Sequence, residues 1–187
     1  MRPLTLILAF APLIVFSVLA RFLPYGLIGV VALAAAVAAV LTTLTSRPPK
    51  FLSTCSLVLF AVIAILGSGL GQGGKEWLAT WGGAGIGLAV GLVILVLIPV
   101  VPVTEEFARE TTPRAYWSSP TFRKINRVTS TGWGVAIFMV GISRVVAAAV
   151  DQGSSRRLPE LLLDLIVPTV IIVGALEFSC SYYRSIQ

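Results

Sequence analysis

The sequence predicts an all-α fold, a polytopic transmembrane helical bundle of six spans, with five as the alternative. Hydrophobic residues make up 57% of the 187 residues. Several apolar runs of about 17–25 residues follow one another, each long enough to cross a hydrocarbon core of about 30 Å. Charged residues contribute only 12% of the chain, against about 25% in a soluble domain. Because a soluble core of this size cannot bury so many long apolar runs, we expect one integral membrane domain covering residues 1–187.

Prolines, glycines and charged residues separate the predicted spans. The spans cover, to within a few residues, 4–22, 25–43, 52–70, 81–101, 128–150 and 161–183. A glycine-rich loop at 71–74 is expected between the third and fourth spans. Arg21 and Pro24 leave only a tight hairpin between the first two spans, so a re-entrant first segment would give five crossings instead.

The distribution of Lys and Arg predicts the orientation of the chain. With six spans, nine basic residues lie on the side of both termini and four on the other side, with Arg144 left inside a span. The side richer in Lys and Arg is normally cytoplasmic. We therefore expect both termini in the cytoplasm.

A polar segment, residues 104–127, is expected to form a cytoplasmic interfacial linker within the membrane domain. Thr104 is predicted to cap a short helix that has Glu105 and Glu106 at its positive end. Ser119 and Pro120 have the residue types that cap and open a second helix.

The second helix of this segment is amphipathic. Phe122 shares one face with Ile125 and Val128, while the basic residues point elsewhere. We expect the helix to lie among the lipid head groups, with anionic lipids as its partners. The predicted interfacial residues are Trp117, Phe122, Arg123, Lys124, Asn126, Arg127 and Trp133. A docking surface for a cytoplasmic partner is the alternative.

Three ionisable residues are predicted at membrane depth: Arg144, Asp164 and Glu177. Each must pair with another group or reach the membrane–water interface, because a charge at the bilayer centre costs about 2.5–3.5 kcal/mol on insertion scales. Arg144 and Asp164 lie at similar depth on consecutive antiparallel spans, so we predict an ion pair. A proton or ion path through Asp164 and Glu177 is the alternative. These two carboxylates are about 20 Å apart along one helix and cannot share a catalytic site.

Gly83, Gly87 and Gly91 recur every four residues in the fourth span. Such a small-residue ridge lets helix backbones approach closely in lipid. Packing within the bundle is the favoured interpretation, and an interface with another membrane protein is the alternative.

The chain lacks the usual residues of catalytic and metal sites. It has no histidine, and its two cysteines are far apart. No phosphate-binding loop, nucleophile elbow or zinc-protease motif is present. We therefore expect no enzyme activity, no cofactor, no metal and no nucleic-acid partner, since the net charge of +6 is explained by orientation and lipid contact.

The chain resembles the bacterial intracellular septation protein A family. Residues 10–16, Phe-Ala-Pro-Leu-Ile-Val-Phe, are similar to the first segment of that family. A later pattern is similar as well, and it comprises Trp117, Pro120, Phe122, Asn126, Trp133, Phe138 and Gly141. The resemblance implies a polytopic bacterial inner-membrane protein linked to cell envelope maintenance and septation, and it carries over no catalytic residue or cofactor.

Three functions remain open from the sequence. The first is a non-enzymatic envelope protein that works through protein or lipid contacts. The second is an accessory subunit of a larger membrane complex, which the glycine ridge would join. The third is a small transporter or lipid flippase that uses the three intramembrane charges.

Overall fold

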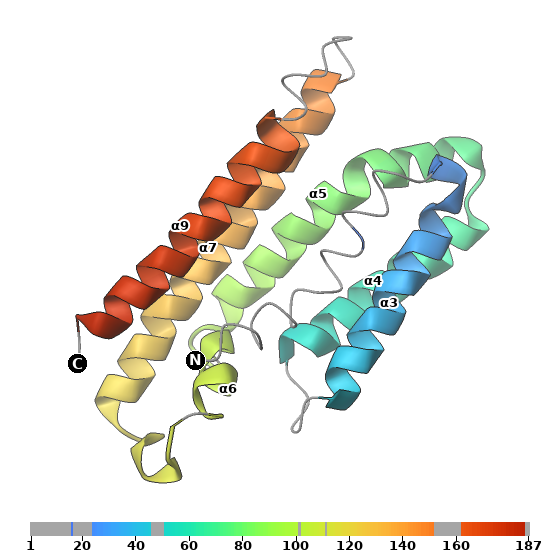
Figure 1. The fold of residues 1–187 in the computed structure, drawn as a ribbon. Coiled ribbons are helices and arrows are strands. Elements are labelled where there is room, and N and C mark those ends of the chain that lie inside the picture. Colours follow the sequence, from blue (N-terminus) through green and yellow to red (C-terminus); the bar gives the residue numbers. More distant parts are fainter. Residues whose placement is uncertain are drawn as a thin grey trace. The chain divides into compact units, whose positions relative to one another are not determined.

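The computed structural model describes residues 16, 24–45, 51–100, 102–110, 112–151 and 162–185, and throughout these residues the regular structure is helical (Figure 1). This agrees with the predicted all-α class. The chain divides into two compact units, residues 1–83 and 84–187, each described by itself below. The boundary falls within the long helix α5 (Gln72–Leu97). The predicted first span, 4–22, lies outside the described residues except for Phe16.

The first unit is built on two apolar helices that pack side by side, α3 (Ile28–Thr45) and α4 (Phe51–Gly69) (Figure 1). A short 3₁₀ turn, η1 (Tyr25–Leu27), leads into α3. Most of the buried side chains of α3 are small, and the buried alanines recur at helical spacing: Ala32, Ala35, Ala36 and Ala39. Alanines allow close packing of the two helices, and Phe60 of α4 fills the interior, where its ring lies 5.2 Å from that of Phe16.

Helix α5 starts earlier than predicted. The prediction of a loop at 71–74 is wrong for the last three of these residues, because α5 begins at Gln72 and contains Gly73 and Gly74. The Lys75 N–H already donates to the Gly71 carbonyl at 3.0 Å.

In the second unit a short helix, α6 (Val103–Ala108), and a 3₁₀ turn, η2 (Arg114–Tyr116), precede the 32-residue helix α7 (Pro120–Asp151). The predicted cap of α7 is confirmed, since the Phe122 N–H donates to the Ser119 hydroxyl at 3.1 Å and Pro120 occupies the first helical position. The predicted interfacial helix and the fifth span are therefore one continuous helix. No proline interrupts this helix between Arg123 and Val150.

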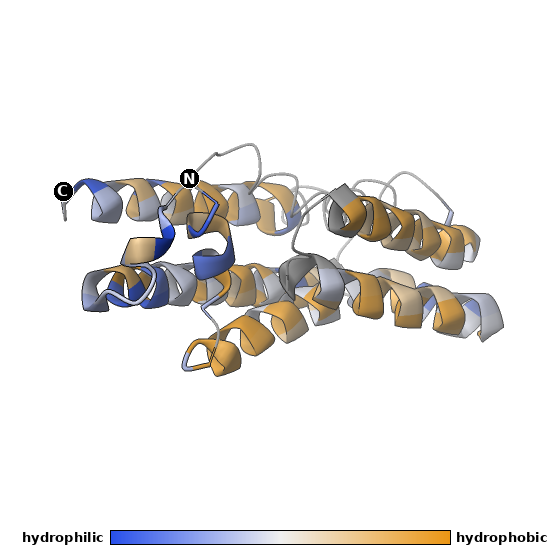
Figure 2. Cartoon of the chain, turned by 90° about the horizontal axis from the view of Figure 1, so that it is seen from below, coloured by the Kyte–Doolittle hydropathy of each residue, from blue (hydrophilic) through white to orange (hydrophobic). Residues whose placement is uncertain are grey.

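The unit ends with a π-helical turn, η3 (Leu162–Ile166), and helix α9 (Val167–Arg184), which packs along α7 (Figure 1). Hydrophilic residues gather at the start of α7 and at the C-terminal end of α9, and the stretches between these ends are mostly apolar (Figure 2). This is the pattern of helices whose middle is in hydrocarbon and whose ends are in water.

Within the described residues, three helical stretches are long and apolar enough to cross a membrane: Gln72–Leu97, Pro120–Val150 and Leu162–Arg184. Two shorter apolar stretches are Ile28–Leu41 and Thr54–Gly69. The structure thus supports an all-helical membrane protein with three long apolar helices. The count of six spans remains a prediction.

Candidate functional site

Arg144 and Asp164 form the predicted ion pair. The Arg144 Nε lies 3.4 Å from the Asp164 Oδ1, which joins α7 to η3. The Arg144 and Asp164 side chains are 22% and 32% exposed. Each charge therefore has a counter-charge within an otherwise apolar pair of helices, which lowers the cost of placing either at membrane depth.

Pro168 follows the π-helical turn that carries Asp164 and leaves one carbonyl of that turn without a backbone donor. In a π-helix each N–H donates to the carbonyl five residues earlier, so the carbonyl of Leu163 would receive a bond from residue 168. Pro168 has no N–H to give. The hydroxyl of Ser143, on α7, donates to the Leu163 carbonyl instead. Ser143 therefore bonds the backbone of the turn, and Arg144 pairs with the Asp164 side chain that the turn carries.

This arrangement favours the structural interpretation of the pair over a transport path. Both groups face each other across α7 and η3, and Glu177 lies about 20 Å along the axis from Asp164.

A buried polar contact, which the sequence did not reveal, joins α6 to α7. Thr104 is 2% exposed, and its hydroxyl donates to the Asn126 carbonyl at 2.9 Å. The Thr104 N–H donates to the Ser130 hydroxyl at 3.0 Å, and the two hydroxyls lie 2.8 Å apart. The prediction that Thr104 caps α6 is wrong, because Pro102 occupies the cap position and Thr104 lies within the helix.

Two predicted interfacial residues lie inside the unit rather than among lipid head groups. Asn126 is 1% exposed, and its side-chain amide donates to the Phe122 carbonyl at 2.8 Å. Trp133 is 6% exposed. Asn126 and Trp133 are seven residues apart on α7, so they share one face, and neighbouring elements of the unit cover it. Phe122 is also buried, as expected of the apolar face of this helix.

The remaining predicted interfacial residues are at the surface. Arg123, Lys124 and Arg127 are exposed on the first turns of α7. Trp117 is half-buried, and its indole N–H donates to the Thr112 carbonyl at 2.9 Å. The guanidinium groups of Arg109 and Arg114 lie 5.0 and 5.7 Å from its ring centroid, within cation–π distance. Trp117 therefore organises a basic surface segment between α6 and α7.

The glycine ridge of α5 is used within the second unit. A Cβ added at Gly87 would lie 2.8 Å from the Gly141 Cα, and one added at Gly91 would lie 2.5 Å from the Phe138 N. These approaches confirm the packing interpretation for Gly87 and Gly91. Gly83 is half-buried and is the last residue of the first unit. Since two of the three glycines meet α7, the ridge does not favour contact with another subunit.

Glu177 lies on an outward face of α9. Residues at helical spacing, all exposed, form this α9 face: Val170, Gly174, Glu177, Ser181 and Arg184. A Cβ added at Gly174 would meet nothing within 4 Å. Within the part of the chain that the structure describes, Glu177 has no ion pair or hydrogen bond through its carboxylate. The face therefore combines small residues with a carboxylate that needs a partner in lipid.

Among the described residues no group of three or more Cys, Asp or Glu side chains could hold a metal ion. Comparison of the chain with protein-family models, with curated proteins and with solved structures finds no match. The function is therefore inferred from the residues of this chain alone.

Proposed function

We propose that this protein is a non-enzymatic multi-pass protein of the bacterial inner membrane that acts by binding another membrane protein through the α9 face. The observation that carries the proposal is Glu177, an exposed carboxylate on an apolar helix. Small residues one turn to either side of it, Gly174 and Ser181, would let a second helix approach closely.

The depth of Glu177 supports this proposal. A Cβ added at Gly132 would lie 2.9 Å from the Phe178 ring, which places Glu177 level with that part of α7. Gly132 is five residues beyond Arg127, or about 7.5 Å along the axis. A carboxylate at that depth favours a partner helix that supplies a Lys or Arg. A parallel second copy of α9 would bring Glu177 against Glu177 and is disfavoured by repulsion.

The process that we propose is cell envelope maintenance and septation, with both termini in the cytoplasm. Its support is the residue pattern shared with the intracellular septation protein A family and the excess of Lys and Arg on the side of the termini.

Site-specific photo-cross-linking in cells tests the proposal. A photoreactive residue replaces Ser181 on the α9 face or, as a control, Ile142 on the exposed side of α7. We expect one protein adduct of defined mass from position 181 and none from position 142. Glu177→Gln should remove the adduct, and Glu76→Gln, which removes an exposed carboxylate of the first unit, should leave it. Lipid adducts alone at position 181 would overturn the proposal.

A further inference from the structure

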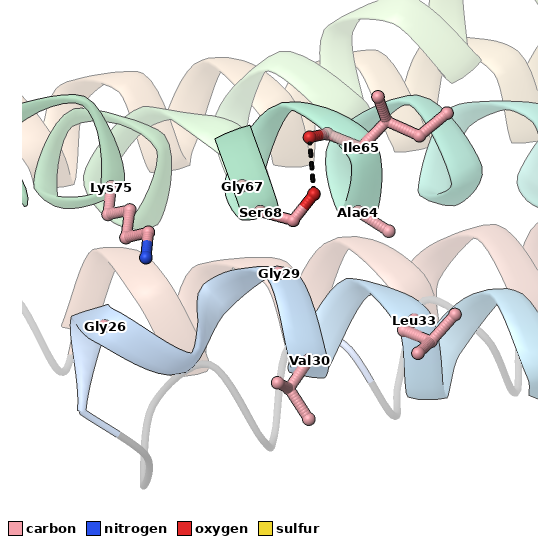
Figure 3. Close-up of a pocket in the computed structure, with 9 residues that line it drawn as sticks. All are labelled: Gly26, Gly29, Val30, Leu33, Ala64, Ile65, Gly67, Ser68 and Lys75. Carbon is pink, nitrogen blue, oxygen red and sulfur yellow. Dashed lines mark hydrogen bonds between the residues drawn. The ribbon is translucent and has the colours of Figure 1, made fainter. Parts of the chain in front are cut away.

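A groove opens along the paired helices of the first unit. It has a volume of about 400 Å³, and its walls come from η1, α3, α4 and the first turn of α5 (Figure 3). Its lining residues are Gly26, Gly29, Val30, Leu33, Ala64, Ile65, Gly67, Ser68 and Lys75. Val30, Leu33 and Ile65 are all more than half exposed, so the groove is open to its surroundings.

Two glycines explain why the groove has this form. A Cβ added at Gly67 would lie 2.9 Å from both the N and the Cα of Gly29. The backbones of α3 and α4 therefore nearly touch at this crossing. The absence of side chains at Gly26, Gly29 and Gly67, together with the small Ala64, leaves space above the crossing.

Among the lining residues that the structure describes, only Lys75 is charged. Its side chain extends from α5 toward Gly26, so that the ammonium lies at one end of the groove (Figure 3). Lys75 is half-buried and forms no ion pair with any residue that the structure describes. The Ser68 hydroxyl already donates to the Ile65 carbonyl at 2.8 Å. The end of the groove is therefore positive, and the rest of its length is apolar.

This combination fits one class of ligand. From Gly26 in η1 to Leu33 in α3 the groove extends over seven residues, about 10 Å, which suits a segment of an acyl chain. A free phosphate would find one cation and few donors, because the other lining residues are mostly apolar. A lipid with a negative head group satisfies both the ammonium and the apolar walls.

We propose that the groove binds one anionic phospholipid, with its phosphate against Lys75 and one acyl chain along Gly29, Leu33 and Ala64. This site is independent of the proposed contact through α9. It would make the first unit selective for the charge of the lipid head group.

Native mass spectrometry of the full-length protein in mild detergent tests this site by counting bound lipids. The probes are phosphatidylglycerol and phosphatidylcholine with identical acyl chains. We expect one phosphatidylglycerol bound at least five times more tightly than phosphatidylcholine. Lys75→Gln should remove that preference, whereas the matched control Lys124→Gln, on α7, should keep it. Ala64→Leu, which fills the groove, should weaken binding of both lipids.

Two further measurements distinguish lipid binding from binding of free phosphate and from the proposed contact through α9. Glycerol phosphate at the same concentration should not compete, and if it displaces the lipid, the site binds free phosphate instead. Glu177→Gln should leave lipid binding intact, so failure of the α9 proposal would not affect this result. Equal losses from Lys75→Gln and Lys124→Gln, or no effect of Ala64→Leu in a protein of unchanged melting temperature, would overturn the assignment.

Discussion

Arg144 and Asp164 compensate each other's charge between α7 and η3, at a separation of 3.4 Å. Asp164→Asn should therefore destabilise the protein, because it leaves the Arg144 guanidinium without its counter-charge. We expect a loss of about 1–3 kcal/mol, below the 3–5 kcal/mol of a fully buried pair, since both side chains remain partly exposed.

The exchange Arg144→Asp with Asp164→Arg is the control for this prediction. It should restore part of the loss, because it keeps both charges and their proximity. Thermal denaturation in detergent of the wild type, both single variants and the exchange checks this outcome. Additive losses without recovery would contradict the ion pair and favour a separate role for Asp164.

Thr104 contributes stability through its hydroxyl. Thr104→Val keeps the shape of the side chain but removes the bonds to the Asn126 carbonyl and the Ser130 hydroxyl. Because these groups are buried, we expect a loss of about 1–3 kcal/mol. Thr131→Val is the matched control, since the exposed Thr131 hydroxyl bonds only the Arg127 carbonyl of its own helix. Denaturant midpoints of the two variants should differ clearly, and equal midpoints would contradict the proposed contact.

At this scale the sequence predicted pairs of opposite charge better than buried polar groups. Arg144 and Asp164 were predictable because a charge in an apolar span must find a partner. The role of Thr104 was not, since a threonine before two glutamates equally suits a helix cap. The tertiary contact with Ser130, 26 residues away, leaves no local pattern in the sequence. Asn126 and Trp133 were assigned to the interface from residue type alone, and only the packing of α7 shows their burial.

Helix α5 packs against α7 through glycines, and this contact can be tested one residue at a time. A Cβ added at Gly91 would lie 2.5–2.8 Å from Phe138, including its backbone N and Cα. Gly91→Ala should therefore push the helices apart, at a cost of about 1–3 kcal/mol, the usual range for overpacking.

Gly85→Ala, on the same helix, is the control for this contact. Its Cβ would meet nothing within 4 Å, so the substitution should be neutral or should stabilise the helix by about 0.5–1 kcal/mol. The difference in melting temperature between the two variants measures the contact. Similar melting temperatures would show that the glycine is not required for the packing of α5 against α7.

At the scale of elements, the sequence predicted which segments are helical more reliably than where they begin. The apolar runs identified α3, α4, α5, α7 and α9. The start of α5 was misplaced because Gly73 and Gly74 are residues typical of a loop, although both lie within the helix. The spacing of Gly87 and Gly91 predicted close packing, but it could not identify Gly141 and Phe138 as the contacts.

For the whole molecule, the charge distribution predicts the topology. Alkaline phosphatase, which is active only outside the cytoplasm, should be inactive when fused after Gln187 and active when fused after Gly153. Green fluorescent protein should give the reverse pattern at these two positions. The reason is the excess of Lys and Arg on the side of both termini. Activity of alkaline phosphatase at Gln187 would contradict the orientation.

The all-helical class followed from composition, because 57% hydrophobic residues in long runs favour helices that cross a membrane. The number of spans did not follow as firmly. Three stretches meet the length and hydropathy of a crossing helix in the described residues. The division of the chain at Gly83 was not predictable, because it depends on contacts between distant residues rather than on a break in the sequence.

The charges on α7 bear on the bilayer thickness that the protein accepts. Arg127 and Arg144 are 17 residues apart on this one helix, or about 26 Å along its axis, and the side chains between them carry no charge. A typical hydrocarbon core is about 30 Å thick. Because Arg144 lies against Asp164, it does not have to reach the head groups of such a bilayer. The ion pair therefore lets α7 accept a bilayer thicker than the spacing of its two arginines, and loss of the pair should make thick membranes less favourable for this protein.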